Sequence, residues 1–432
     1  FLDSKEDLVR RGLDQLRQVY PDYENSVHRF IASDPIRILR RRIDVAQLAN
    51  GGKKAVLMVM HSWGGGTERH VFELSSALEK EGTPVLLLRD EIPGRVKLSR
   101  FGHSEVENLS FDLACDFDEI VEVLRLVPVG HVHIHHLIGF DPAIRDLASA
   151  VGVTVDFTVH DYFTLCPRIN MVDDRASYCG APEVEVCNAC VKRNGSELGS
   201  GIDVEEWRRD STRLLQAARR VFVPSRDTLD RMERHVEGVQ WCLRPHPETT
   251  SGVSSRRVSS RSDEPLRIAV IGAIGFHKGA AVLEECAIDA AKRDLPIEFH
   301  VIGYTDRDEG LLSTGKVEIH GRYREEELQS RLAESRTSLA FLPSVWPETF
   351  CYTLSAAFEA GLYPVAFDIG APSARIKESG WGEVISIRLS GAEINDHLIE
   401  LEIPDFVGFS PDREIVADYS DYLSHYYDAL EI

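Results

Sequence analysis

The feature that most constrains the fold of this chain is a strand–loop–helix–strand pattern that occurs twice. The first copy starts with the apolar run AVLMVM at 55–60 and continues through the loop HSWGGGTE, a helix at 69–82 and a strand at 84–89. The second copy starts with LRIAVIG at 266–272, before a glycine-rich loop and a helix at 280–292. Two strands joined through a helix form a βαβ unit. Each copy therefore predicts a parallel sheet covered by helices.

Further apolar runs extend both copies. In the first half they are HVHIHHL (131–137), VTVDFTVH (153–160) and RRVFVPS (219–225); in the second they are IEFHVIG (297–303), KVEIH (316–320), TSLAFLP (337–343) and YPVAFD (363–368). We therefore predict an α/β chain with two Rossmann-like, doubly wound domains that face a cleft. The predicted organisation is an N-terminal helical extension at 1–50, a first domain at 51–248, a Ser- and Arg-rich linker at 249–264, and a second domain at 265–410.

Length and charge limit the functions that fit. A chain of 432 residues predicts two or three domains, and its net charge of −21 argues against a nucleic-acid partner. No apolar run reaches the length of a membrane span, and the first residues are too charged for a signal peptide. The basic run Arg40, Arg41 and Arg42 indicates a solvated helix face, with peripheral contact to a membrane surface as the alternative. We expect a cytoplasmic protein; the oligomeric state is not indicated.

Three loops carry residues that suit a phosphate or sugar ligand. Gly64, Gly65 and Gly66 follow the first strand and allow the backbone to approach a ligand, although a plain tight turn would also explain them. The loop from Gly272 to Gly279 includes Lys278, a cation beside a helix start that suits a diphosphate. An exposed lysine is the alternative. In the third loop Glu348 precedes a turn and a helix, which places a carboxylate acceptor beside backbone donors.

These motifs together resemble a known family of enzymes. The Gly-Gly loop, His160-Asp161, Lys278-Gly279 and the stretch from Pro347 to Gly361 are similar to the retaining glycosyltransferases of family four, the "group one" enzymes with the GT-B fold. The resemblance covers about residues 54–430. It implies transfer from a nucleotide-sugar donor to a glycan or lipid-linked saccharide acceptor, with retention and without a catalytic metal. It also implies a role in polysaccharide biosynthesis, with the inner membrane face as one location, and a C-terminal return helix at 411–432.

The resemblance assigns roles to particular residues. Lys278 would hold the donor diphosphate, Glu348 the hydroxyls of the transferred sugar, and His160 would sit near the anomeric carbon and the acceptor. We take these three as the catalytic candidates. The donor would also meet the glycines of the first two loops, the backbone around residue 351 and a residue near the base pocket: Gly65, Gly66, Gly272, Gly275, Phe350, Cys351, Tyr352 and Arg322.

Two positions depart from the family pattern. Ala273 stands where many relatives have an Arg, and Ala356 stands where the second Glu of E-x7-E binds the ribose. Glu359, three residues further along the predicted helix, is our candidate to replace that contact. A catalytically impaired module that binds glycans or acts as a scaffold is therefore the alternative function. A nucleotide-dependent oxidoreductase is a weaker one, because G-x-G-x-x-G is missing.

Four cysteines form the second candidate site. Cys166, Cys179, Cys187 and Cys190 lie in one loop, and their terminal C-x2-C spacing fits a tetrahedral structural Zn²⁺. Unbound thiols and two disulfides are the alternatives. Two D-x-D matches, at 116–118 and 306–308, are set aside, because a chain with 70 acidic residues produces such matches by chance.

Overall fold

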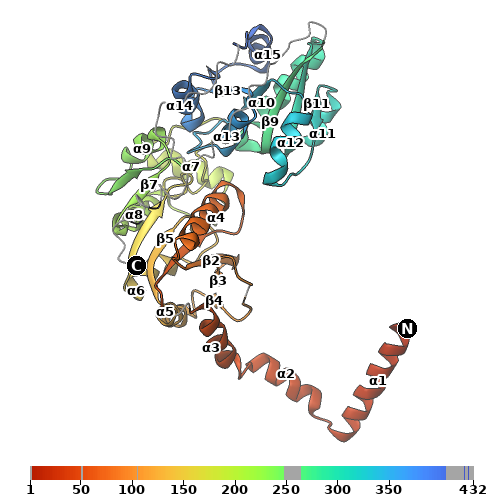
Figure 1. Cartoon of the computed structure of the whole chain (residues 1–432), viewed down its shortest axis with the longest axis vertical. Helices are drawn as coiled ribbons and strands as arrows, with labels where there is room; N and C mark the ends of the chain where they lie inside the picture. Colours follow the sequence, from red (N-terminus) through yellow and green to blue (C-terminus); the bar gives the residue numbers. More distant parts are fainter. Residues whose placement is uncertain are drawn as a thin grey trace.

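The computed structural model describes residues 2–49, 52–104, 106–247, 264–404, 423 and 427, and confirms the two predicted doubly wound α/β domains. Figure 1 shows the domains one above the other, with helices on both faces of each sheet and three further helices leading away from the first domain. The predicted linker lies outside the described residues apart from Glu264, and the predicted return helix does so apart from Leu423 and Tyr427.

The first domain is built on an eight-stranded sheet with the order β4-β3-β2-β1-β5-β6-β7-β8. The strands are β1 Ala55–Met60, β2 Val85–Ile92, β3 Arg95–Arg100, β4 Ser110–Asp112, β5 Val129–Ile134, β6 Thr154–Thr158, β7 Val221–Val223 and β8 Trp241–Leu243. All six residues of β1 are buried, as expected for a strand covered on both faces. The first sheet is parallel, as predicted, except at one edge, where β3 follows a tight turn at Gly94 and pairs antiparallel with both β2 and β4.

Helices follow most strands of the first domain. They are α4 Gly65–Lys80, α5 Phe117–Leu126, the 3₁₀ helix η1 Pro142–Asp146, α6 Leu147–Val151, α7 Val184–Asn194, α8 Val204–Ala217 and α9 Arg226–Glu233. Asp203 and Ser225 cap the starts of α8 and α9 by accepting hydrogen bonds from Glu206 N–H and Thr228 N–H. These two caps fix the residues at which α8 and α9 begin.

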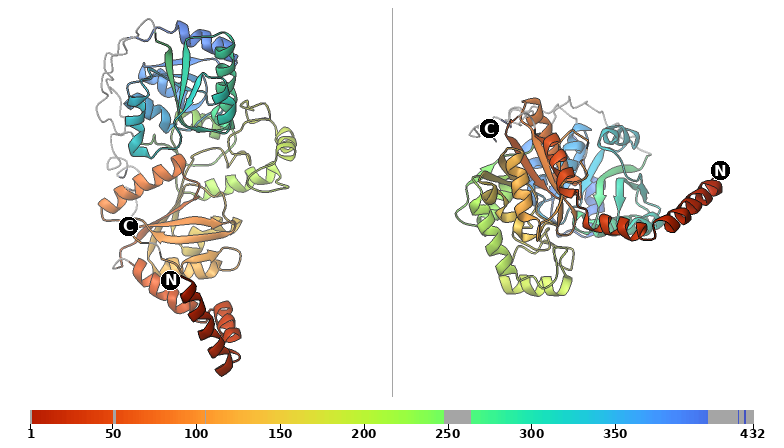
Figure 2. Two further views of the ribbon diagram at one scale, coloured as in Figure 1. Left: turned by 90° about the vertical axis from the view of Figure 1, so that its right-hand side faces the viewer. Right: turned by 90° about the horizontal axis from the view of Figure 1, so that it is seen from below.

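The second domain has a six-stranded, wholly parallel sheet with the order β11-β10-β9-β12-β13-β14. Its strands are β9 Leu266–Ile274, β10 Ile297–Thr305, β11 Val317–Ile319, β12 Leu339–Leu342, β13 Tyr363–Phe367 and β14 Glu383–Ile385. Its helices are η2 Phe276–Lys278, α10 Ala280–Lys292, α11 Asp308–Ser313, η3 Glu325–Glu327, α12 Leu328–Glu334, α13 Tyr352–Glu359, α14 Gly370–Ser379 and α15 Gly391–Glu400. Figure 2 shows these helices packed around the sheet.

The N-terminal helices are α1 Leu2–Val19, α2 Tyr23–Ser33 and α3 Arg37–Leu48. The expectation of a solvated basic face is wrong for Arg41, which is 5% exposed. Its guanidinium donates to the carbonyls of Asn108 and Ser110 and pairs with Glu119. Arg41 thereby fixes α3 to the first domain, while Arg40 and Arg42 stay exposed. Within the described part of the chain, no helix has both the length and the apolar composition that crossing a membrane requires.

Two described residues near the C-terminus pack against the first domain. Leu423 and Tyr427 join the buried cluster that includes β1 and α4. The Tyr427 hydroxyl lies 2.8 Å from Nδ1 of His133, a buried residue of β5. The chain therefore returns to the first sheet after completing the second domain.

Both sheets reverse their strand order at an inner pair. The reversal falls between β1 and β5 in the first sheet and between β9 and β12 in the second. Ligands of doubly wound sheets bind beyond the carboxyl ends of the strands at such points. The loops that follow these four strands are therefore where the site is sought.

Candidate active site

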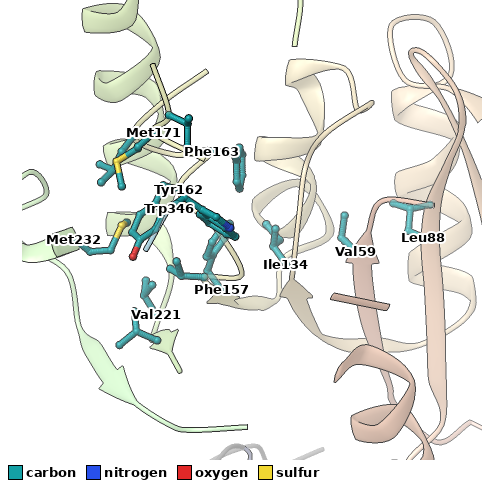
Figure 3. Packing of buried hydrophobic residues seen from close by; sticks show 14 of the residues in the cluster. Val59, Leu88, Ile134, Phe157, Tyr162, Phe163, Met171, Val221, Met232 and Trp346 are labelled. Carbon is teal, nitrogen blue, oxygen red and sulfur yellow. The ribbon is translucent and has the colours of Figure 1, made fainter. Parts of the chain in front are cut away.

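A loop at the reversal point of the second sheet meets the loop after β6 of the first sheet at the junction of the domains. Thr349, from the loop after β12, donates its hydroxyl to the carbonyl of His160, from the loop after β6, at 2.7 Å. Trp346 of the second domain packs edge-on against Tyr162 of the first, with ring centroids 6.1 Å apart. Figure 3 shows Trp346 beside Tyr162, among buried residues of the first domain. These contacts bring the loop of His160 and the loop of Glu348 to one junction.

Lys278 and Glu348, predicted to act on the same donor, form an ion pair. Lys278 is the last residue of η2, and its Nζ lies 2.5 Å from Oε2 of Glu348. The Glu348 side chain is 7% exposed and that of Lys278 is 27% exposed. The ammonium also lies 5.8 Å from the centre of the Trp346 ring. The structure therefore places a paired cation and carboxylate at the carboxyl edge of the second sheet.

The electrostatics of the pair keep both groups charged. Burial opposes the charged form of Lys278, but the facing Glu348 outweighs it and the pKa of the ammonium is raised. Burial likewise disfavours the Glu348 carboxylate, and the charge and hydrogen bond of Lys278 outweigh it, so the pKa of Glu348 is lowered. His277 stays neutral, because burial, helped by Lys278, lowers its pKa to about 4.

Close backbone packing fixes the two loops that carry this pair. A Cβ on Gly279, whose φ is +85°, would lie 1.9 Å from the carbonyl oxygen of Pro343, so only glycine fits after Lys278. The Val345 amide donates to the carbonyl of His277 at 3.1 Å. The Glu348 carbonyl accepts from the Ala371 amide at 2.8 Å, at the start of α14. Lys278 and Glu348 are therefore positioned by backbone contacts.

A strained turn precedes α13. Cys351 has φ of +76°, a left-handed conformation that is rare outside glycine, and it caps the helix. Arg375 of α14 donates to the carbonyls of Phe350 and Cys351, each at 2.9 Å, and its guanidinium lies over the Phe350 ring. Burial lowers the pKa of Arg375 to about 9. Sequence reasoning missed Arg375, which holds the turn in this conformation; nothing in its local sequence distinguishes it from a surface arginine.

The predicted glycines of the first loop face the same turn. Gly65 and Gly66 form the first turn of α4 and are not part of the loop, since Gly64 already takes the cap position. A Cβ on Gly66 would lie 3.2 Å from Cδ2 of Tyr352, so a glycine permits the close approach. Arg69, one turn further along α4, lies over the Tyr352 ring at 4.5 Å and pairs with Glu325. The start of α4 therefore touches the candidate donor site.

The remaining donor candidates lie at different places. Gly272 is in β9 with φ of +111°, and a Cβ there would meet the Thr353 methyl at 3.3 Å, while Gly275 precedes η2. Arg322 is exposed and lies over the Tyr304 ring at 4.2 Å. Glu359 is half-buried, and Oε2 accepts from Gln329 at 2.9 Å. The structure places Gly272 against Thr353 of α13 and Gly275 at the start of η2, and sets Arg322 and Glu359 beside other partners.

His160 lies in a group of imidazoles. Its Nε2 is 3.0 Å from Nδ1 of His135, and its ring is 5.3 Å from that of His70 and 5.6 Å from that of His246. Burial, followed by the neighbouring imidazoles, lowers the pKa of His160 well below its usual value. The neighbouring Asp161 accepts from Nε2 of His136 at 2.9 Å. His160 is therefore a neutral group at this junction.

Sequence reasoning treated HVHIHH only as a strand. Its alternating histidines, at 131, 133 and 135, lie on one face of the sheet, as the period of two requires. That alternation was the available signal for the cluster.

The four candidate metal-binding cysteines lie together in the loop after β6 and in α7. All are free thiols, and burial, followed by the neighbouring Cys179 and Cys187, raises the pKa of Cys166 to about 11. Arg208 and Arg168 donate to the sulfurs of Cys187 and Cys190, each at 3.4 Å. In the described chain, no three of the four sulfurs all lie within 4.8 Å of one another. A tetrahedral metal would have to draw them closer.

The architecture defines the class of fold. Two Rossmann-like domains that meet through the carboxyl ends of their strands form the GT-B fold. Among solved structures, the chain is similar to sucrose-phosphate synthase from Thermosynechococcus elongatus, with 16% identity, a TM-score of 0.54 and coverage of 81% of this chain and 90% of that one. It is also similar to the lipopolysaccharide outer core galactosyltransferase WaaB, with 11% identity, a TM-score of 0.56 and coverage of 87% and 99%.

A third similar structure is Anabaena HepE in complex with UDP, with 12% identity, a TM-score of 0.53 and coverage of 86% of this chain and 95% of that one. No protein-family model and no curated protein sequence matches the chain. At these identities the likeness establishes the fold.

Proposed function

We propose that this chain is a glycosyltransferase that moves a sugar from a nucleotide-sugar donor to a glycan or lipid-linked saccharide acceptor, with retention. The observation that carries the proposal is the Lys278–Glu348 pair at the edge of the second sheet, at the junction with the His160 loop. A cation beside a carboxylate matches a diphosphate joined to a polyhydroxylated sugar. The similar structures that hold UDP or UDP-glucose support a nucleotide sugar as donor.

Donor binding would exchange partners within the pair. The diphosphate replaces Glu348 as the partner of Lys278, and the freed carboxylate accepts hydrogen bonds from sugar hydroxyls. The backbone N–H groups of Phe350, Cys351 and Tyr352 at the start of α13 add donors for the phosphate. This exchange couples recognition of the phosphate to recognition of the sugar.

In the transfer step the bond between the anomeric carbon and the diphosphate oxygen breaks, and a bond to an acceptor hydroxyl oxygen forms on the same face. The proton of that hydroxyl passes to the departing diphosphate. Negative charge grows on the leaving diphosphate, where Lys278 and the α13 N-terminus stabilise it. A neutral His160 serves as a hydrogen-bond partner near the anomeric carbon and the acceptor. In this proposal Lys278 balances the charge on the leaving group, so the reaction needs no catalytic metal.

The test is turnover of the purified chain with UDP-glucose and a panel of other nucleotide sugars, measured as release of nucleoside diphosphate. Lys278→Ala should lower turnover by orders of magnitude. Lys316→Ala is the matched control, because Lys316 has a similar exposure of 19% and also pairs with a carboxylate, that of Asp294, but lies at the opposite end of the sheet. Equal turnover in both variants contradicts the assignment of Lys278. Failure of every donor to bind or react favours the impaired glycan-binding module.

We also propose a structural zinc ion held by Cys166, Cys179, Cys187 and Cys190. Four free thiols in one loop form a suitable donor set, and the two arginines beside the sulfurs offset thiolate charge. Elemental analysis of protein purified without chelator should give one zinc per chain from this loop, and Cys187→Ser should remove it. Protein without zinc, or with the same zinc content in the variant, contradicts the assignment.

The resemblance to family-four enzymes supports a role in polysaccharide biosynthesis. A lipid-linked acceptor would bring the enzyme to the cytoplasmic face of the inner membrane. Fractionation of cells into soluble and membrane-associated protein tests this part of the proposal.

A further inference from the structure

Four imidazoles converge where the first domain meets the second. His70 comes from α4, His135 follows β5, His160 follows β6 and His246 follows β8. One ring nitrogen from each of His70, His135 and His160 lies within 4.8 Å of the other two. The His246 ring is 4.0 Å from that of His70. Residues far apart in the sequence thus bring nitrogen ligands to one point.

Protein hydrogen bonds explain the neighbouring histidines but leave part of this group unexplained. His133 bonds Tyr427 and Thr158, and His136 bonds Asp161. By contrast, Nε2 of His135 and Nδ1 of His246 are buried and have no hydrogen-bond partner among the described residues. His135 is 0% exposed and His246 is 3% exposed. A buried polar atom without a partner is unfavourable, so Nδ1 of His246 points to a ligand that is missing beside this group.

The chemistry of the group selects the kind of ligand. The imidazoles of His70, His135 and His246 are buried, and the ring nitrogen of an imidazole that carries no proton offers a lone pair, which a cation can use and an anion cannot. The three ligand atoms of this group are all ring nitrogens, and no carboxylate oxygen is among them. Such a ligand set disfavours Mg²⁺ and Ca²⁺ and favours zinc, copper, nickel or cobalt. With metal–nitrogen bonds of about 2.0–2.1 Å, tetrahedral ligand nitrogens lie roughly 3.3 Å apart. Nδ1 of His135 and Nε2 of His160, the atoms with which these two residues would bind the metal, are already 3.0 Å apart.

We propose that His70, His135 and His160 bind a divalent transition-metal ion of the zinc class, with His246 as the adjacent fourth ligand. The site is separate from the cysteine loop and uses nitrogen ligands only. The ion would lock α4 to the ends of β5 and β6 and would occupy the lone pair of His160.

Occupancy would also suppress sugar transfer, a consequence that rests on the proposed function. His160 cannot accept a hydrogen bond from the acceptor or the sugar while its Nε2 binds a metal. The ion is therefore an inhibitor of the proposed reaction and not a cofactor for it.

The direct test is titration of the full chain with Co²⁺, followed by absorption spectroscopy. Nitrogen ligands give d–d bands without the sulfur-to-cobalt charge-transfer band that binding at the cysteines would add, so the two sites are distinguished in the wild-type protein. His70→Gln should weaken the nitrogen-only binding by roughly a hundredfold or more. His300→Gln is the matched control, because His300 of β10, Glu318 of β11 and His320, which follows β11, form a second group of potential ligands in the other domain.

The outcomes separate the two parts of the proposal. Cobalt bound only through sulfur, or binding lost in His300→Gln and kept in His70→Gln, overturns the histidine site. If His70→Gln does not fold, cobalt binding by His135→Gln and the cobalt spectrum of the wild-type protein decide whether the histidine site exists. Zn²⁺ should inhibit nucleotide release by the wild type and not by His70→Gln, and a chelator should restore it. Metal binding through His70 without inhibition overturns the regulatory part, whereas absence of any transferase activity contradicts the proposed function and leaves the metal site standing.

Discussion

Gly370 offers a way to move Glu348 without altering any residue that would touch the donor. It is the first residue of α14 and has φ of +69°. A Cβ added there would lie 2.7 Å from the backbone nitrogen of Glu348 and 2.7 Å from two backbone atoms of Pro347. Gly380, which follows the same helix, has φ of +66° but nothing within 4 Å of its added Cβ. Gly370→Ala and Gly380→Ala therefore share backbone strain and differ in the clash.

The expected magnitudes follow from that difference. An alanine held in the left-handed region costs about 1–2 kcal/mol at either position. Only at Gly370 is the clash added, and overpacking of this kind costs about 1–3 kcal/mol more. We expect Gly380→Ala to lower the free energy of unfolding by about 1–2 kcal/mol and Gly370→Ala by about 2–5 kcal/mol. Relief of the clash should also displace Glu348 from Lys278.

Urea denaturation of both variants measures the free energy of unfolding, and calorimetry with a nucleotide sugar that the wild type binds measures donor affinity. Gly370→Ala should weaken donor binding at least tenfold, and Gly380→Ala should leave it unchanged. Equal losses of stability in the two variants would refute the argument from the clash. Unchanged donor affinity in a destabilised Gly370→Ala would refute the role of Glu348 position.

Two further predictions concern charge and the ribose contact. The fully buried Asp156 pairs with His131 and Arg219. These two partners outweigh burial and lower the pKa of Asp156 below the usual 3.8. The charged carboxylate therefore stabilises the folded protein above that pH, and this stabilisation is lost as the pH falls below it. Asp156→Asn should lower the free energy of unfolding at pH 7, measured by urea denaturation, by about 3–5 kcal/mol, and the difference from wild type should shrink between pH 5 and pH 3. Asp396→Asn, which removes an exposed ion pair with Arg293, should change the free energy of unfolding little. If Glu359 replaces the missing ribose contact, Glu359→Gln should weaken and Ala356→Glu strengthen nucleotide binding by calorimetry; no change in either variant removes that role.

The repeated strand–loop–helix pattern was sufficient to predict the two domains, because long apolar runs between glycine-rich loops leave few alternatives to a doubly wound sheet. The edge strands were harder. In β3 the charged residues Arg95 and Lys97 alternate with Val96 and Leu98, a half-buried pattern that differs from the fully apolar runs of the parallel strands. β4 has only three residues, too few for any periodicity.

The candidate site was predictable where a short motif holds the chemistry. Lys278 and Glu348 lie in separate motifs, and the resemblance was sufficient to predict that the two side chains lie close together, as their ion pair shows. The packing around them could not be predicted in that way. Arg375 acts on carbonyls 24 and 25 residues away, and His70 meets His246 only after α4 and the end of β8 are folded together. Such contacts depend on the relative placement of elements, which local sequence does not encode.

The contact between His133 and Tyr427 has a consequence for the timing of synthesis. The two residues are 294 positions apart, and the first domain's buried cluster includes Tyr427 and Leu423. At roughly 5–20 residues per second, a ribosome needs about 15–60 s to bridge that separation. During this interval the nascent first domain would carry an incomplete core whose apolar surface is open to chaperones or to other nascent chains. Emergence of Leu423 and Tyr427, and not emergence of the first domain, is thus the moment at which this half of the protein can become fully folded.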